Sequence, residues 1–400
     1  MTYRILSLDG GGTWAAIQVQ ALMQLYTPAT TGHQVLGDFD LAVANSGGAI
    51  VLGALVENLS LSAIFDKFNV EADRRSIFQP TTQIWGLISN LINFGPKYST
   101  TAKLPALAAI LPNAGGQALS QAISGVKSQG SAADVHLLVT AFDFDRNVAA
   151  FFRSAPTALG WGVGAASTVT LAQAVHASST PPVNYFDQPA AFTGSRYWDG
   201  AISGCNNPVL AGVAEALTLD IAPADIRVLS LGTGTRRLPG PPTQQPQSPL
   251  QEPTSPQGFP IDIEKLATSI LDDPPDIATF LAHAMTGGRN GVPARPAGAA
   301  VTPDSRIVRM SPMISPVRDA ANTKWVPPGT WTAEQFDYLA NDIHLDALDQ
   351  GDVDYITAFG SWWIADEVTN QPVRMHTDSL APEIGYSKFS HAALAWSIIR

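Results

Sequence analysis

The 400-residue chain contains little cysteine and little charge. Cys205 is its single cysteine, which excludes an internal disulfide framework and is typical of a reducing compartment. Only 14% of residues are charged, and 23 basic residues against 34 acidic ones give a net charge of −11. A chain without a basic patch attracts neither nucleic acid nor anionic membranes by charge. We therefore expect no nucleic-acid partner.

The sequence also shows no long apolar run, and we expect no secretory leader. No uninterrupted apolar segment reaches the ~18 residues of a membrane-spanning helix. The N-terminal run, residues 3–8, has none of the basic start, apolar centre and cleavage site of a signal peptide. We therefore expect a cytoplasmic protein, although export without a cleavable signal would leave no such trace. The 45% hydrophobic content is sufficient for a large core.

A strand, a tight turn and a helix are predicted for residues 39–55, where an apolar run is interrupted by Asn-Ser-Gly-Gly. A nucleophile elbow, G-x-S-x-G, has small residues two before and two after its serine. Ala44 and Gly48 fill these places around Ser46. Such a turn exposes the serine hydroxyl and puts the N–H of Gly47 at a helix N-terminus, which suits an oxyanion. Taken alone, the short motif favours an ordinary glycine-rich turn.

A second strand-loop-helix unit precedes it. The strand at residues 3–8 leads into Gly10, Gly11 and Gly12, and successive glycines let backbone N–H groups converge on an anion. The following residues lack the lysine of a P-loop, and Ala15 replaces the third glycine of a dinucleotide fingerprint. A glycine loop followed by a serine turn is a more specific signal, because acyl-transfer enzymes commonly take one oxyanion donor from each.

Two residues are candidates for the base that activates a serine. Asp199 ends an aromatic strand and precedes Gly200, so a turn can hold its carboxylate towards a cleft; the alternative is an Asp-Gly turn bonded to its own backbone. His176 lies in an Ala/Val-rich helical stretch, where a lone histidine is more often packed than catalytic. None of the seven histidines fits a Ser, Asp/Glu, His order. We find no metal-ligand spacing and expect no metal or organic cofactor.

Three of these motifs together resemble those of the patatin-like phospholipases. Asp9-Gly10-Gly11-Gly12 resembles the family's oxyanion loop, Ala44-Asn45-Ser46-Gly47-Gly48 its nucleophile elbow, and Asp199-Gly200-Ala201 its catalytic aspartate motif, in the same order and spacing. The resemblance covers residues 3–237 well and the remainder more faintly. It implies a Ser46–Asp199 dyad in which the aspartate assists deprotonation directly, and an oxyanion hole built from the N–H groups of Gly10, Gly11, Gly12 and Gly47.

The predicted fold agrees with this family. Strands alternate with helices along the chain, which favours a mainly parallel central sheet flanked by helices on both faces, an α/β fold. We expect one patatin-like domain over residues 1–400, with the catalytic core at 1–237. Pro/Gln/Gly-rich loops around a helical insertion occupy 238–303, and a strand and helices occupy 304–400. Within these, we predict helices at 331–349, 350–363 and 389–399. The apolar stretch 84–92 can be a lipid-contacting cap or, more commonly, a core helix.

Three positions depart from the family pattern. Trp14 stands where the family usually has Arg or Lys, Ala15 where it has Gly, and Ala44 replaces the first elbow glycine. Loss of the cation would weaken a polar anchor near the oxyanion loop, and Ala15 would tighten the helix start. The reactive side chains and the three loop glycines are retained.

The combined reading predicts a serine lipid acyl hydrolase, either a phospholipase of A type or an esterase. Its partners would be a lipid or ester substrate and, transiently, a membrane approached through apolar contacts rather than charge. Two alternatives stay open. The same acyl-enzyme could pass its acyl group to an alcohol or thiol, which would make a transferase, or the three departures could mark a lipid-binding protein with impaired catalysis.

Overall fold

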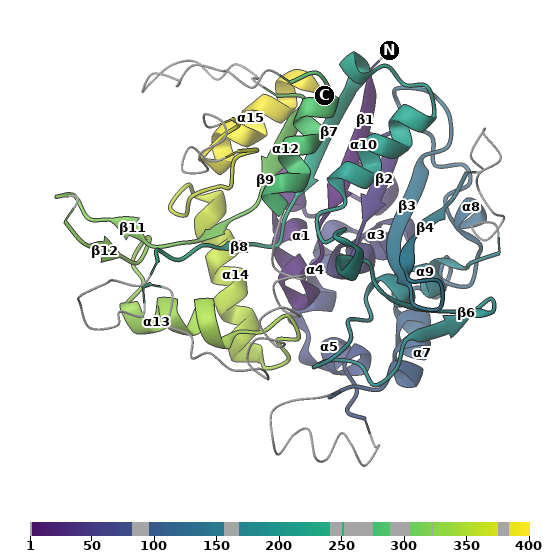
Figure 1. The fold of residues 1–400 in the computed structure, drawn as a ribbon, viewed down its shortest axis with the longest axis horizontal. Helices are drawn as coiled ribbons and strands as arrows, with labels where there is room; N and C mark the ends of the chain where they lie inside the picture. The colour runs from purple at the N-terminus through teal and green to yellow at the C-terminus, as the bar shows by residue number, and fades with distance from the viewer. Residues whose placement is uncertain are drawn as a thin grey trace.

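A computed structural model describes residues 2–81, 96–155, 168–240, 250–251, 275–288, 305–321, 323–374 and 384–400, and every structural statement below refers to them. Within these ranges, eight strands form one sheet in the order β5-β6-β3-β2-β1-β7-β9, with β4 paired to β3 (Figure 1). The strands are β1 (Tyr3–Leu8), β2 (Leu41–Ala44), β3 (His136–Asp143), β4 (Val148–Arg153), β5 (Ala190–Phe192), β6 (Ser195–Asp199), β7 (Ile226–Leu231) and β9 (Ile307–Met310). Four two-residue strands lie outside this sheet and form two separate pairs: β8 (Thr235–Arg236) with β10 (Met313–Ile314), and β11 (Val317–Arg318) with β12 (Trp325–Val326).

The centre of the sheet is parallel. β1 lies between β2 and β7, so that Ile5 is paired with Leu41 on one side and with Val228 on the other. β3 and β9 extend this parallel part, whereas β4, β5 and β6 are antiparallel. The central strands are almost continuously apolar because both of their faces are covered, as is typical of parallel sheets. Their carboxyl ends therefore meet at one edge, where both sequence motifs follow β1 and β2.

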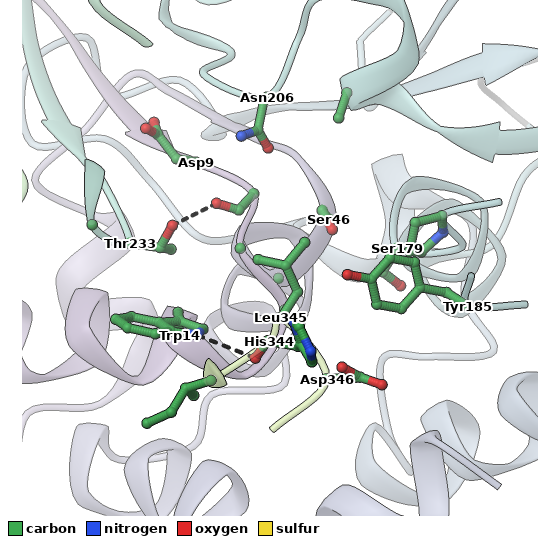
Figure 2. A pocket seen from close by; sticks show the side chains of 18 of the residues that line it. Asp9, Trp14, Ser46, Ser179, Tyr185, Asn206, Thr233, His344, Leu345 and Asp346 are labelled. Atoms are coloured by element: carbon green, nitrogen blue, oxygen red, sulfur yellow. Dashed lines mark hydrogen bonds between the residues drawn. The ribbon is translucent and has the colours of Figure 1, made fainter. Parts of the chain in front are cut away.

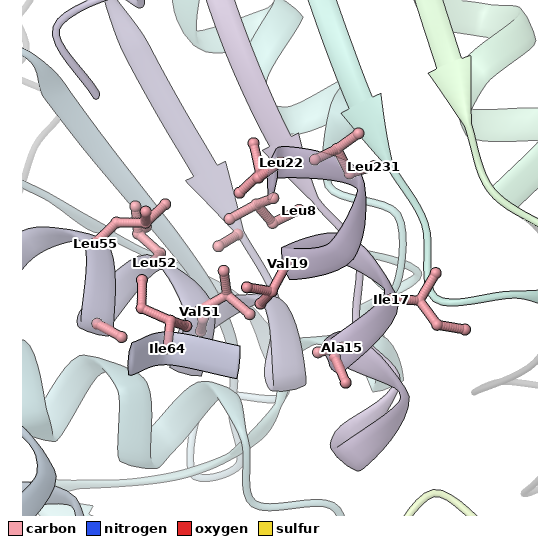
Figure 3. Packing of buried hydrophobic residues seen from close by; sticks show 14 of the residues in the cluster. Leu8, Ala15, Ile17, Val19, Leu22, Val51, Leu52, Leu55, Ile64 and Leu231 are labelled. Carbon is pink, nitrogen blue, oxygen red and sulfur yellow. The ribbon is translucent and has the colours of Figure 1, made fainter. Parts of the chain in front are cut away.

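Helices cover both faces. α10 packs against β1, β2 and β7, and α12 against β9, over alternate residues such as Ile5 and Val43. The intervening residues, such as Leu8, face α1, α3 and α4, whose apolar side chains interdigitate in Figure 3. The helices are α1 (Ala16–Leu25), α2 (Gly32–Leu36), α3 (Ser46–Val56), α4 (Leu61–Asn69), α5 (Glu71–Ile77), α7 (Thr100–Ile110), α8 (Leu119–Ala122), α9 (Leu171–Ser178), α10 (Val209–Thr218), α12 (Pro275–Met285), α13 (Ala333–Asp337), α14 (Gln350–Ile364) and α15 (Phe389–Ile399). Shorter helical turns are η1 (Gly12–Ala15), η2 (Gly200–Ser203), η3 (Pro223–Asp225) and η4 (Tyr338–Asp342).

This architecture confirms the predicted α/β fold with a mainly parallel sheet and helices on both faces. The helices predicted at 350–363 and 389–399 are α14 and α15. The stretch 84–92 lies outside the described residues, as does most of the predicted insertion, of which α12 is described. No described helix combines the length and the apolar character that crossing a membrane requires.

The single helix predicted for 331–349 is wrong. Helical structure ends with η4 at Asp342, and the chain then runs without regular structure to α14. Carbonyl groups of this segment accept hydrogen bonds from residues outside it. The Trp14 indole donates to the carbonyl of His344, the Thr13 amide to that of Leu345, and Arg74 to that of Leu348. Tertiary hydrogen bonds therefore replace the helical ones that periodicity alone favoured.

Candidate active site

Ser46 lies at the sharp turn between β2 and α3. Its φ of 49° is a left-handed value that non-glycine residues adopt only where the surroundings impose it. Two glycines make the turn possible by their lack of a side chain. A Cβ on Gly48 would lie 2.4 Å from the carbonyl oxygen of Leu8, and one on Gly47 would lie 2.5 Å from that of Gly12. The first strand-loop unit therefore packs directly against the turn that carries the serine.

The carboxyl group of Asp199 faces Ser46 from the end of β6. The serine hydroxyl acts on this carboxyl group and lowers its pKa. Two donors fix the carboxyl group: Asn45 Nδ2 at 3.0 Å and the backbone N–H of Ala201 at 2.9 Å, both to Oδ1. Asn45, the residue before the serine, thereby ties the two motifs together across the sheet edge. Gly200 is required beside them, since a Cβ there would lie 2.5 Å from Asn45 Oδ1.

The electrostatic surroundings suit a proton acceptor. Asp199 is 1% exposed, and burial raises the pKa of its carboxyl group above the ordinary value. The Ser46 side chain, the hydrogen bonds from Ala201 and Asn45, and the charge of Lys103 act in the opposite direction. A carboxylate that is more basic than usual can accept a proton from a neighbouring hydroxyl.

The glycine loop, residues 10–12, packs between Thr233 and Leu345, which lie in two distant parts of the chain. Gly11 has a φ of 154°, and a Cβ on it would lie 2.2 Å from Thr233 Oγ1. Gly12 has a φ of 56°, and a Cβ on it would lie 2.2 Å from the carbonyl oxygen of Leu345. Thr233 also donates to the carbonyl of Gly10 at 2.7 Å (Figure 2). Glycine is thus needed at these positions for close packing as well as for backbone conformation.

The four predicted oxyanion donors differ in their surroundings. The N–H of Gly10 donates to the carbonyl of Asn206 at 2.8 Å. None of the described residues accepts a hydrogen bond from the N–H of Gly11, Gly12 or Gly47. Gly47 lies in the first turn of α3, where N–H groups have no partner within the helix. These three amides remain available to an anion, whereas that of Gly10 fixes the loop.

A buried ion pair supports the loop from within the sheet. Asp9 directly follows β1 and contacts Arg309 of β9 at 2.6 Å, and both residues are 2% exposed. Burial raises the pKa of Asp9 to about 6, although the Arg309 charge and hydrogen bond act to lower it. Arg309 also donates to Ser230 Oγ at 2.9 Å. The carbonyl of Asp9 accepts the N–H of Gly48, which joins this pair to the serine turn.

Ser46 and Asp199 line a cavity of about 690 Å³, within the range of small-molecule sites. One wall comes from the glycine loop and another from residues 339–346, far away in the sequence. Figure 2 shows Leu345 beside the loop and His344 held by the Trp14 indole, whose Nε1 donates to the His344 carbonyl at 3.3 Å. Asp346 anchors this wall from its other end by accepting a 2.5 Å hydrogen bond from the Tyr98 hydroxyl.

The three departures from the family pattern are accommodated. Trp14 is 6% exposed, fastens the 339–346 wall through its indole N–H and meets Phe359 edge to face at 6.5 Å. Ala15 and Ala44 are fully buried. A Cβ on Gly47 would lie 3.1 Å from that of Ala15, so Ala15 closes the space beside the elbow. The position of the expected cation is thus taken by a side chain that shapes the cavity.

The sequence missed two features of the cavity. Residues 339–346 belong to no motif, and only their helical periodicity was visible. Lys103 of α7 also lines the cavity and is 0% exposed, a placement that a lysine in an Ala/Leu-rich helix does not signal. His176 does not line it; burial, followed by the Lys103 charge, lowers its pKa to about 3. The histidine is therefore neutral and packed. The part of the chain that the structure describes contains no cluster of His, Cys, Asp or Glu that could hold a metal ion.

A family match covers the part of the chain that carries Ser46 and Asp199. The family model for patatin-like phospholipase matches residues 6–213, just over half of the chain. No curated protein matches. Among solved structures, VipD from Legionella pneumophila is 10% identical with a TM-score of 0.34, covering 100% of this chain and 75% of its own, which is too low a similarity to support any inference. The family match includes the glycine loop, Ser46 and Asp199. The chain therefore belongs to the patatin-like phospholipase family, a family of lipid acyl hydrolases.

Proposed function

We propose that this protein is a serine lipid acyl hydrolase, of phospholipase A or esterase type, that works through a Ser46–Asp199 dyad. The observation that carries the proposal is that Ser46 and Asp199 line one cavity, where Asn45, the residue before the serine, donates a 3.0 Å hydrogen bond to Asp199 Oδ1. A second support is the left-handed turn at Ser46, because strain of this kind persists where it orients a reactive group. The family match supplies the general activity.

The first half of the reaction forms an acyl-enzyme. Asp199 accepts the hydroxyl proton as Ser46 Oγ bonds to the ester carbonyl carbon, and the carbonyl electron pair moves to its oxygen. The N–H groups of Gly11, Gly12 and Gly47 stabilise this oxyanion at the N-terminus of α3. When the tetrahedral intermediate collapses, the bond to the leaving alcohol breaks and the alcohol takes the proton from Asp199.

The second half returns the enzyme to its starting state. Water loses a proton to Asp199 and attacks the acyl carbon, and collapse expels Ser46 Oγ, which recovers the proton from Asp199. No histidine, metal or organic cofactor enters these steps. Asn45 contributes by holding Asp199 Oδ1 at 3.0 Å, which leaves the carboxyl group oriented towards the serine through the whole cycle.

Substrate and setting follow from the same reading. We propose a lipid or ester substrate whose acyl chain enters the cavity between the glycine loop and residues 339–346. A net charge of −11 favours transient, apolar membrane contact over electrostatic attraction, and disfavours nucleic acid. We also propose a cytoplasmic location and one domain over residues 1–400, supported by the pairing of β9 with β7 in the sheet that carries the motifs.

Ester hydrolysis by the purified chain tests the proposal. Short-chain p-nitrophenyl esters and phospholipid vesicles are offered to the parent, to Ser46→Ala and to Ser397→Ala, an exposed serine on α15 that serves as control. Hydrolysis should fall at least ~10³-fold in Ser46→Ala and stay at the parent rate in the control. Equal rates in parent and Ser46→Ala would refute the assignment. Acyl esters formed from an added alcohol would point to a transferase, and lipid binding without turnover to a binding protein.

A further inference from the structure

Lys103 is an unusual residue to find beside the dyad. It is 0% exposed on α7 and lines the same cavity as Ser46 and Asp199. Its Nζ donates to the carbonyl of Ser179 and to Thr180 Oγ1, the latter at 3.3 Å, and lies 4.3 Å from the centre of the Phe186 ring. Neither hydrogen-bond acceptor is charged. A buried ammonium is costly unless its charge serves another group, and Asp199 is the carboxylate that acts on it.

The segment that Lys103 anchors joins the nucleophile to the base. The backbone N–H of Ser46 donates to Ser178 Oγ at 2.9 Å, and the backbone N–H of Asp199 donates to the Thr180 carbonyl at 2.9 Å. Residues 178–180 are thus a strut between the two reactive residues. Lys103 is bonded to the middle and the end of this strut, so its position affects both sides of the dyad at once.

We propose that Lys103 is a positioning residue of the dyad, which fixes the strut 178–180 and brings a positive charge to the side of the cavity that carries Asp199. This inference rests on the proposed function. Removing the ammonium has two separable consequences: a displaced strut slows the reaction at every pH, whereas a lost positive charge changes the pH at which Asp199 becomes protonated. The second consequence distinguishes the proposal from a packing role.

The charges around this pair are few. Burial lowers the pKa of Lys103 to about 7, although the charge of Asp199 acts to raise it. His176 faces Lys103 from α9 and is neutral, and Cys205 has its pKa raised mainly by burial and also by Asp199. From α5, which packs on α7, Arg74 bonds to backbone carbonyls and to Gln350. The partly exposed Glu71 and Asp73 and the exposed Arg75 form ion pairs at the surface.

The pH dependence of kcat/KM tests the proposal. Lys103→Met keeps the length of the side chain without its charge, Lys103→Arg keeps the charge, and Lys127→Met removes an exposed lysine as a control. The acid limb of the profile should move upward by about one pH unit or more in Lys103→Met, return towards the parent in Lys103→Arg, and stay unchanged in Lys127→Met. A slower Lys103→Met enzyme with the parent's inflection would overturn the proposal, as would an unaltered profile.

A reciprocal experiment needs no Lys103 variant and no turnover. Because coupling between two titrating groups is mutual, Asp199→Asn should lower the pH at which Lys103 titrates. Lysine-selective isotope labelling and NMR would follow that titration in the parent and in Asp199→Asn. An unchanged Lys103 titration would refute the coupling. If the coupling is seen but Ser46 proves unreactive, the proposed hydrolase function fails and the Lys103–Asp199 coupling stands. If Ser46 is reactive but no coupling is seen, the hydrolase function stands and the role proposed for Lys103 fails.

Discussion

Because Asp9 and Arg309 form a buried ion pair, the stability of this protein should depend strongly on the charges of these two side chains. Arg309→Met removes the guanidinium but fills similar space, and leaves Asp9 buried without its partner 2.6 Å away. Breaking a fully buried ion pair on one side costs about 3–5 kcal/mol of unfolding free energy. We expect that loss at pH 8, where the unpaired carboxylate must either be ionised inside the protein or take up a proton.

The loss should shrink in acid, and the sign follows from the pKa of Asp9. Folding raises that pKa from 3.8 to about 6, so the stability that the group contributes is complete below pH 3.8 and is lost as the pH rises through about 6. Arg309→Met raises the folded pKa further by removing the lowering effect of the guanidinium. At pH 5 Asp9 is largely protonated in both proteins, and the loss should fall to roughly 1–2 kcal/mol from the missing hydrogen bonds.

Equilibrium unfolding in urea, followed by the fluorescence of the nine tryptophans, measures this difference. With an m value of ~3 kcal/mol/M, the midpoint of Arg309→Met should drop by about 1 M or more at pH 8. Adding Asp9→Asn to Arg309→Met removes the stranded charge and should restore at least about half of the loss. A loss below ~1 kcal/mol at pH 8, or equal losses at pH 5 and pH 8, would refute this reasoning.

Three further substitutions test the walls of the cavity. Gly12→Ala puts a Cβ 2.2 Å from the carbonyl of Leu345 at a φ of 56°, so kcat should fall ~10²-fold through a misplaced oxyanion donor, whereas Gly116→Ala, with nothing within 4 Å, should be neutral in the same ester assay. Trp14→Phe removes the hydrogen bond from the indole to the His344 carbonyl, so the free energy of unfolding in urea should fall by about 1 kcal/mol. The KM values across a series of acyl chain lengths should also change. An unchanged series would contradict the role given to this tryptophan. His176→Leu should retain kcat in a folded protein, because this histidine is neutral and outside the cavity, and a loss of ~10²-fold or more would show that it acts as a base after all.

Local motifs allowed much of the fold to be predicted. Apolar runs such as residues 3–8 and the glycine turns after them depend on neighbouring residues in the chain, so β1, β2 and the helices that follow them could be expected from the sequence. The same holds for α14 and α15, whose apolar periodicity is regular. These elements also carry Ser46, and the end of β6 carries Asp199. The resemblance of these local motifs to those of the patatin-like family is why the candidate dyad could be named before the structure.

Contacts between distant segments could not be predicted from the sequence. Residues 343–346 were predicted to be helical but are not, because hydrogen bonds from Trp14, Thr13 and Tyr98, which no local pattern reveals, hold them in another conformation. Lys103 was missed for the same reason, since its partners at 178–180 are more than seventy positions away. The engaged N–H of Gly10 likewise depends on Asn206, far along the chain. Tertiary packing, rather than propensity, decides these features.

Labelling with a fluorophosphonate probe tests the central claim most directly, because such probes react with serines that a neighbouring base activates. The parent, Ser46→Ala and Asp199→Asn are compared by intact mass, and the labelled peptide is identified. We predict one probe per parent chain, attached to Ser46, no label on Ser46→Ala, and strongly slowed labelling of Asp199→Asn. A folded parent that takes up no probe, or a Ser46→Ala variant labelled as fast as the parent, would contradict the assignment of Ser46 as the nucleophile.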